Sequence, residues 1–190
     1  MSLYTHLHCQ HCGEKYDKNI VQNYCHTCTQ PLVAVYDLSM GVSKDIINTD
    51  RYDMWRYAAL LPVEKEENIV SLGEGWTPML HLRKTQSAFG LAKLWMKEEG
   101  LNPTGSFKAR GIGMAVSKAK ELGINKFCIP TAGNAGSALS AYTATMDGEA
   151  HIYMPEATPQ VFQLDCEVMG AQVKKVKGSI RDAGLAMAND

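Results

Sequence analysis

The pattern of hydrophobic and polar positions is most regular in the part of the chain after Pro78. Short apolar runs alternate there with longer segments in which apolar residues recur at helical spacing, and glycines separate many of them. The runs predict strands at Leu91–Lys97, Lys126–Pro130, Ala150–Met154 and Gln172–Val176, and the longer segments predict helices at Phe107–Leu122, Ala135–Met146, Gln160–Met169 and from Ser179 onward. This alternation predicts an α/β fold of three layers, a parallel sheet between helices, with Cys128 buried in its strand.

The first 77 residues show weaker patterns. Arg51–Leu61 predicts a short amphipathic helix that ends before Pro62, and Gly73–Gly75 predicts a turn. Residues 1–38 hold few large aliphatic side chains, too few to bury a core without a metal or other cross-link. We therefore predict three parts: a ribbon at 1–38, a linker with a helical segment at 39–77, and an α/β domain at 78–190.

Four of the six cysteines form two Cys-x-x-Cys pairs near the start of the chain: Cys9, Cys12, Cys25 and Cys28. Each pair can present two thiolates from one tight turn, and Gly13 gives the first turn a permissive backbone. Two facing pairs complete the tetrahedral sulfur shell that structural zinc prefers. The spacing therefore predicts one structural zinc ion.

Four histidines lie near these cysteines and could compete as ligands: His6, His8, His11 and His26. Because four thiolates already fill a zinc shell, we expect the histidines to lie on the surface. Zinc ribbons often bind nucleic acid, but residues 1–38 carry only two lysines against three acidic residues. We therefore expect a structural ribbon and no nucleic-acid partner.

The composition is that of an ordinary globular protein, with 45% hydrophobic residues, 21% charged residues and a formal net charge of −1. This charge gives no reason to expect an anionic membrane as partner, and no apolar run is long enough to span a bilayer. The first residues lack the apolar core of a signal peptide, so we expect a cytoplasmic location.

Two loops that precede predicted helices carry candidate chemistry. Leu101–Gly111 is rich in turn-forming residues and places Lys108 in the first turn of a helix, where the positive end of the helix dipole favours a neutral, nucleophilic amine. Most helical lysines are solvated, and the spacing alone does not distinguish the two cases. Thr131–Ser137 could bind an anion with free backbone N–H groups, or it could be a simple turn with Asn134 as the helix cap. It lacks the spacing of a dinucleotide-binding loop.

Three ordered motifs carry a resemblance to a known family. The run Asn102-Pro103-Thr104-Gly105-Ser106-Phe107-Lys108-x-Arg110-Gly111 resembles the cofactor-lysine motif of the tryptophan-synthase-β-like pyridoxal-phosphate enzymes. Within that group it is similar to the threonine synthase family, as are Leu72-Gly73-Glu74-Gly75-x-Thr77-Pro78 and the four-cysteine ribbon. Ala109 stands where many threonine synthases carry aspartate.

The resemblance implies that Lys108 bonds covalently to pyridoxal phosphate and moves protons on the substrate, with Phe107 near the cofactor ring. It also implies that Asn134 hydrogen-bonds the cofactor's ring hydroxyl. The same resemblance assigns the substrate carboxylate to one short stretch: Thr131, Ala132, Gly133, Asn134 and Ala135. The implied reaction converts O-phospho-L-homoserine and water to L-threonine and phosphate, so the partner is a small amino-acid substrate.

Alternatives remain open from the sequence: cysteate synthase, a threonine or serine dehydratase, or a non-catalytic zinc-binding interaction module. The family's glycine-rich phosphate cup is absent from these 190 residues, and the last predicted helix has no stop signal. We therefore expect an N-terminal part of a protein about twice as long, inactive by itself, with a homodimer in the complete enzyme.

Overall fold

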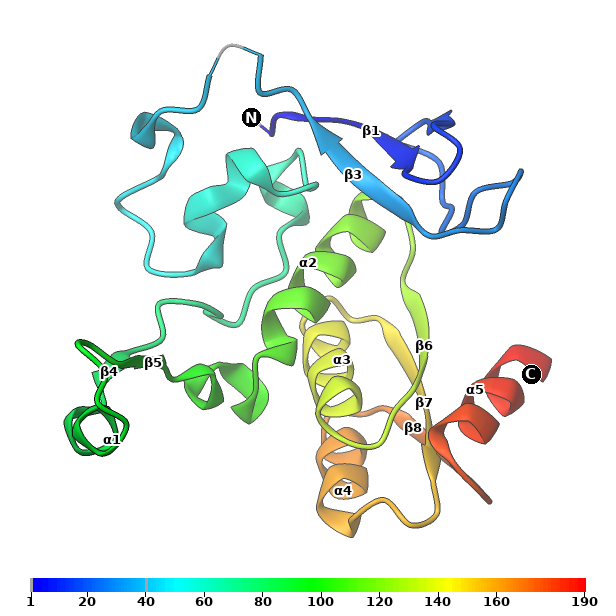
Figure 1. Ribbon diagram of the computed structural model, residues 1–190. Helices are drawn as coiled ribbons and strands as arrows, with labels where there is room; N and C mark the ends of the chain where they lie inside the picture. Colours follow the sequence, from blue (N-terminus) through cyan, green and yellow to red (C-terminus); the bar gives the residue numbers. More distant parts are fainter. Residues whose placement is uncertain (1, 40) are drawn as a thin grey trace.

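The computed structural model describes residues 2–39 and 41–190. The chain begins with a small antiparallel sheet that the sequence analysis did not predict. Its three strands stand in the order β2-β1-β3: β1 (Tyr4–Cys9), β2 (Lys15–Tyr16) and β3 (Leu32–Tyr36). The Lys18 ammonium attaches this sheet to the rest of the chain, because it donates to the Tyr4 carbonyl at 3.0 Å and to Glu64 at 2.6 Å. The ribbon sheet thus lies close to the end of helix α2 (Lys108–Glu121) (Figure 1).

Between the ribbon and the α/β unit the chain forms short 3₁₀ helices: η1 (Lys44–Ile46), η2 (Met54–Leu60) and η3 (Glu66–Asn68). The amphipathic helix expected over Arg51–Leu61 is therefore shorter and of another type. Its start moves to Met54 because the Asp53 side chain accepts from the Trp55 N–H at 2.9 Å and caps the segment there. Its middle is interrupted at Tyr57, where φ is −100° and ψ is 23°.

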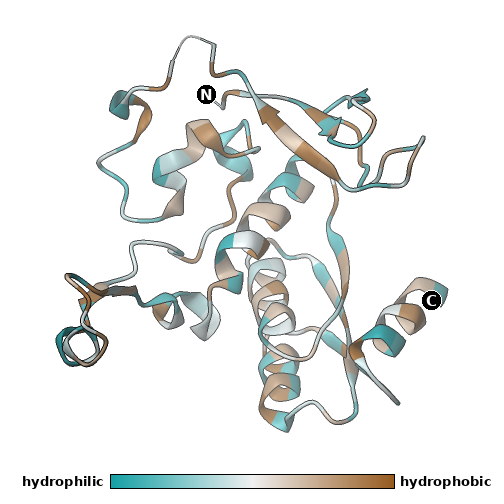
Figure 2. Ribbon diagram, viewed as in Figure 1, coloured by the Kyte–Doolittle hydropathy of each residue, from teal (hydrophilic) through white to brown (hydrophobic). Residues whose placement is uncertain are grey.

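The strand expected at Leu91–Lys97 was wrong in length and in partner. The observed strand β5 (Trp95–Lys97) pairs antiparallel with β4 (Met79–His81), and helix α1 (Arg83–Ala88) lies between them. The three residues of β4 are too few for a periodic signal, so its pairing with β5 could not be seen in the sequence. The hairpin of β4 and β5 lies apart from the parallel sheet (Figure 1), and hydrophobic residues colour part of its ribbon brown in Figure 2. One of its apolar side chains, Met79, is 61% exposed.

The remaining residues form the predicted α/β unit. Two short helices, η4 (Glu99–Leu101) and η5 (Pro103–Gly105), lead into α2. There follow β6 (Lys126–Pro130), α3 (Asn134–Thr145), β7 (Glu149–Pro155), α4 (Gln160–Val168), β8 (Gln172–Val176) and α5 (Ile180–Asn189). The three strands are parallel in the order β6-β7-β8, with Ile152 opposite Ile129 on one side and Val173 on the other.

Helices cover both faces of this sheet, which confirms the three-layer prediction (Figure 1). Helices α3 and α4 pack on one face, with α2 against α3, and α5 packs on the other. The core between them is fully buried at Ile152, Met154, Cys166 and Tyr142. None of the described helices is long and apolar enough to cross a bilayer.

The expectation that Cys128 is buried was wrong, because its side chain is exposed. Successive side chains of a strand point to opposite faces. Phe127 and Ile129 pack against the core, so Cys128 points to the other face of β6. Within the described residues β6 is one of the two outer strands of the sheet, and α5 leaves the Cys128 side chain exposed.

Candidate active site and cysteine cluster

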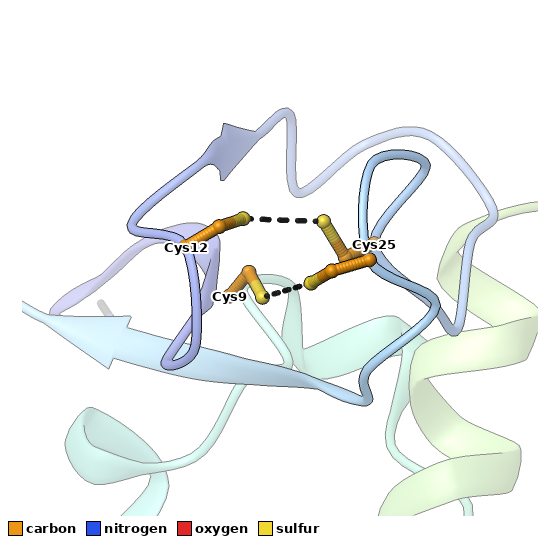
Figure 3. Close-up of side chains that lie close together, drawn as sticks. Cys9, Cys12 and Cys25 are labelled. Atoms are coloured by element: carbon orange, nitrogen blue, oxygen red, sulfur yellow. Dashed lines mark hydrogen bonds between the residues drawn. The ribbon is translucent and has the colours of Figure 1, made fainter.

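The four clustered cysteines converge in space. Their Sγ atoms all lie within 4.8 Å of one another, with 3.4 Å between Cys9 and Cys28 and 3.4 Å between Cys12 and Cys25 (Figure 3). These separations exceed a disulfide bond of about 2 Å, and they bracket the roughly 3.8 Å between thiolates that share one tetrahedral zinc ion. Within the described part of the chain, the group consists of these four cysteines and includes none of the histidines.

The two Cys-x-x-Cys turns have the same backbone form. The Gly13 N–H donates to the Cys9 carbonyl at 2.9 Å, and the Thr29 N–H donates to the Cys25 carbonyl at 2.9 Å. Both donors have positive φ, 82° at Gly13 and 56° at Thr29. Glycine takes this conformation freely, whereas threonine is strained in it, so the second turn is held by its surroundings.

Cys25 is surrounded by donors that favour its thiolate. Burial alone raises the pKa of this thiol. A hydrogen bond of 3.1 Å from the Tyr16 hydroxyl, together with backbone N–H groups of the turn, outweighs burial and lowers the pKa to about 6. A deprotonated thiol is the form that binds a metal ion. The cluster therefore has the geometry of a thiolate metal site, and Cys25 favours its thiolate, whereas burial and the neighbouring thiols raise the pKa of Cys12 and of Cys28.

Lys108 lies at the start of α2, as predicted, at the end of the turn-rich loop. The backbone N–H of Lys108 donates a hydrogen bond to the hydroxyl oxygen of Ser106 at 3.3 Å. The Lys108 ammonium group makes no hydrogen bond or ion pair within the described residues. It stands 4.7 Å from the centre of the ring of Phe107, a residue that is 57% exposed. The amine is thus available to a ligand, with an exposed aromatic face beside it.

The glycine–asparagine loop leads from β6 into α3. Gly133 has φ 148°, and a Cβ there would lie 3.0 Å from the Phe162 ring, so only glycine fits. The Thr131 hydroxyl accepts from the N–H groups of Gly133 at 3.1 Å and Gly136 at 3.3 Å. Asn134 is the first helical residue and is exposed, so the helix cap is Gly133 and not Asn134. Within the described residues the Asn134 side chain makes no hydrogen bond, so it and the helix N-terminus can meet a ligand.

The buried carboxylate of Glu74 joins the upstream motif to helix α3. Glu74 is fully buried and accepts from the Trp55 indole N–H at 2.6 Å and from the Tyr142 hydroxyl. Next to it, the Gly75 N–H donates to the Asn102 side chain at 3.0 Å, which ties this motif to the lysine loop. Helix α3 also packs against η5 of that loop. The three stretches singled out in the sequence after residue 70 are thus brought together.

The sequence analysis missed the residues that hold these loops in place. Glu74 and Arg110 stood inside quoted motifs, but nothing in their spacing revealed a structural role. Glu99 lay outside every quoted motif. In the structure its carboxylate accepts two hydrogen bonds from Arg110, at 2.6 and 2.8 Å. Their partners are distant along the chain, as with Tyr142, and a pattern of neighbouring residues carries no signal for such pairs.

Comparison with known proteins agrees with this arrangement. Two curated relatives, both named threonine synthase, match almost the whole chain. The relative from Methanosarcina acetivorans is 36% identical over 94% of the chain, and that from Methanocaldococcus jannaschii is 35% identical over 92%. The chain spans 44% of the length of each.

Solved structures show the same fold over part of the chain. The serine racemase of Dictyostelium discoideum covers 60% of it with 28% identity and a TM-score of 0.53, across 37% of its own length. The O-acetylserine dependent cystathionine beta-synthase of Helicobacter pylori covers 60% with 25% identity and a TM-score of 0.55, across 40% of its own length. Residues 70–190 match the family described as "Pyridoxal-phosphate dependent enzyme". The chain belongs to this family of pyridoxal-phosphate dependent enzymes.

Proposed function

We propose that the chain is the N-terminal part of a threonine synthase, which converts O-phospho-L-homoserine and water to L-threonine and phosphate. The observation that carries this proposal is the extent of the match. Both threonine synthases align with more than nine tenths of the chain, an extent that must take in part of residues 1–38. The racemase and the cystathionine beta-synthase each cover 60% of it. The longer match therefore favours threonine synthase over those two enzymes.

The residues present fit the lysine side of a pyridoxal-phosphate site. The Lys108 amine is unpaired within the described residues, and Asn134 and the start of α3 are open to a ligand. We assign binding of the cofactor to Lys108, Phe107 and Asn134. When bound, the cofactor supplies an electron sink for negative charge on the substrate carbons.

The residues of this chain then bind, orient and transfer protons. The N–H groups at the start of α3, in the stretch Thr131–Ala135, hold the substrate carboxylate at the positive end of the helix dipole. The Asn134 amide would hydrogen-bond the cofactor's ring hydroxyl and help to orient it. The Lys108 amine would take and return protons at the substrate carbons.

We also propose one structural zinc ion on Cys9, Cys12, Cys25 and Cys28. Its support is the convergence of four Sγ atoms within 4.8 Å. Four thiolates leave no open position for a substrate, so this ion stabilises the ribbon and takes no part in the reaction. The cytoplasmic location and the homodimer of the complete enzyme remain predictions.

The direct test uses the protein at its full natural length. Incubation with O-phospho-L-homoserine should release threonine and phosphate in equal amounts. The same preparation offered threonine or serine should give little keto acid, and it should form no cysteate from the substrates of a cysteate synthase. Keto acid or cysteate as the main product, without threonine, would contradict the proposal.

A further inference from the structure

The loop before Lys108 is held in a shape that its own residues do not favour. Thr104 has φ 59° and Gly105 has φ 69°. A left-handed backbone is unfavourable for threonine and persists only where surrounding contacts impose it. The Thr104 hydroxyl is also buried, without a hydrogen-bond partner in the described part of the chain. Contacts outside these two residues must therefore maintain the loop.

One carboxylate makes those contacts on both sides of the loop. Glu99 Oε2 accepts from the Asn102 amide at 3.0 Å, where the loop begins, and from Arg110 Nε at 2.6 Å, two residues after Lys108. Its Oε1 accepts from Arg110 Nη2 at 2.8 Å and from the Thr77 hydroxyl at 2.7 Å. The Glu99 side chain thus joins the start of the loop, the first turn of α2 and the upstream motif.

The charge of Glu99 is needed for this arrangement. The two-point hydrogen bond from Arg110 lowers the pKa of Glu99 to about 2, so the group stays ionised at neutral pH. Each oxygen of the carboxylate accepts from two donors. A glutamine has the same shape, but its amide nitrogen would face two donors in either orientation, and two hydrogen bonds would be lost.

We propose that Glu99 is a positioning residue for Lys108: it fixes the strained loop so that the lysine amine stands where the cofactor requires it. This inference rests on the proposed function for its catalytic consequence. Glu99 is not among the residues that we assign to the cofactor or the substrate. Its loss should leave the fold largely intact and let the loop relax, which displaces the Lys108 amine. A displacement of about 1 Å at a reacting group lowers kcat about 100-fold.

A matched control lies at the other end of the same helix. Glu121, the last residue of α2, is a partly buried carboxylate that binds Lys118 at 2.6 Å and accepts from the N–H groups of Glu64 and Lys65. Glu121→Gln removes the carboxylate charge and the bond to Lys118, far from Lys108, while its amide oxygen can still accept from the two backbone N–H groups. We expect Glu99→Gln to lower kcat about 100-fold and Glu121→Gln to leave it near wild type.

The readout that does not depend on activity is amide hydrogen exchange in the cofactor-free, full-length protein. Peptides that span residues 102–109 should exchange faster in Glu99→Gln than in wild type, and should be unchanged in Glu121→Gln. Glu99→Asp keeps the charge with a shorter reach, so its kcat and exchange should fall between wild type and Glu99→Gln. If Glu99→Gln does not fold, the same measurements on Glu99→Asp test the inference.

Wild-type kcat and wild-type exchange in the Glu99 variants would overturn the inference, as would equal losses of kcat in Glu99→Gln and Glu121→Gln. Failure of the proposed function is seen separately. If borohydride does not fix the cofactor on Lys108 of the wild-type protein, Lys108 is not the cofactor lysine, whatever the exchange data give. Fixation on Lys108 combined with an unaffected Glu99→Gln would refute only the positioning role.

Discussion

Helices α2 and α3 approach so closely at Gly113 that a single methyl group should separate them. A Cβ at this position would lie 2.7 Å from Cε1 and 3.1 Å from Cζ of the Tyr142 ring. That ring is fully buried, and its hydroxyl donates to Glu74, so it cannot move aside without breaking a hydrogen bond to a buried carboxylate. We therefore expect Gly113→Ala to destabilise the fold.

The expected change in the free energy of unfolding is the sum of two costs and one gain. Overpacking of a core costs about 1–3 kcal/mol, and weakening a hydrogen bond to a charged group costs about 1.5–3 kcal/mol. The better helix propensity of alanine returns about 1 kcal/mol. The net loss in the free energy of unfolding should be about 3 kcal/mol. Gly111, on the same helix, has open space within 4 Å of the point where a Cβ would stand, so Gly111→Ala should stabilise by up to about 1 kcal/mol.

Urea unfolding followed by circular dichroism measures both variants against wild type. The account requires opposite signs, a loss for Gly113→Ala and a small gain for Gly111→Ala. Equal stability of Gly113→Ala and wild type would show that the two helices are not packed as closely as the structure has them. A loss of similar size in both variants would refute the assignment of the effect to Tyr142.

Three further predictions concern the metal, the charge network and the lysine. Cys9→Ser should lower the melting temperature, because metal binding energy is folding energy, while turnover per folded molecule of the full-length enzyme stays near wild type; the exposed Cys128→Ser is the control. Glu99 has a pKa of about 2 in the folded chain because of Arg110, below its ordinary 4.5. The contribution of the Glu99 charge to stability should therefore be complete above pH 4.5 and lost as the pH falls toward 2. Glu99→Gln should remove this pH dependence from the free energy of unfolding measured with urea. Lys108→Ala should abolish threonine formation without changing the far-ultraviolet circular dichroism, since alanine preserves helix propensity.

Sequence patterns predicted the α/β unit well because its elements are long and separated by glycines. Strands β6 and β8 have the predicted bounds, and α2 differs by one residue at each end. Gly123, with φ 77°, ends α2 as a left-handed glycine should. Local periodicity and local backbone freedom are sufficient for such elements.

The same patterns failed where distant residues determine the structure. The central strand of the ribbon, β1, pairs with β3, so that Cys9 stands opposite Leu32, a residue far along the chain. The hairpin strand β4 has three residues and depends on its pairing with β5. The burial of Cys128 depended on whether α5 covers its face of the sheet, which the strand's own residues do not reveal.

The candidate site divides in the same way. Motifs identified Lys108 and Asn134, the residues that face a ligand, since their type and loop context are local. The carboxylates that position these loops, Glu74 and Glu99, act through Trp55, Tyr142 and Arg110, and only the folded chain brings these partners together. Their absence from the sequence-based prediction reflects the long-range origin of the network.

The central claim is that Lys108 holds the cofactor, and one measurement tests it most directly. The full-length protein, purified with pyridoxal phosphate, is treated with borohydride, digested, and mapped by mass spectrometry. The account predicts the mass of the reduced cofactor on the peptide that contains Lys108 and on no other lysine peptide. Cofactor fixed on a different lysine, or a tightly bound cofactor that borohydride fixes to no lysine, would contradict it.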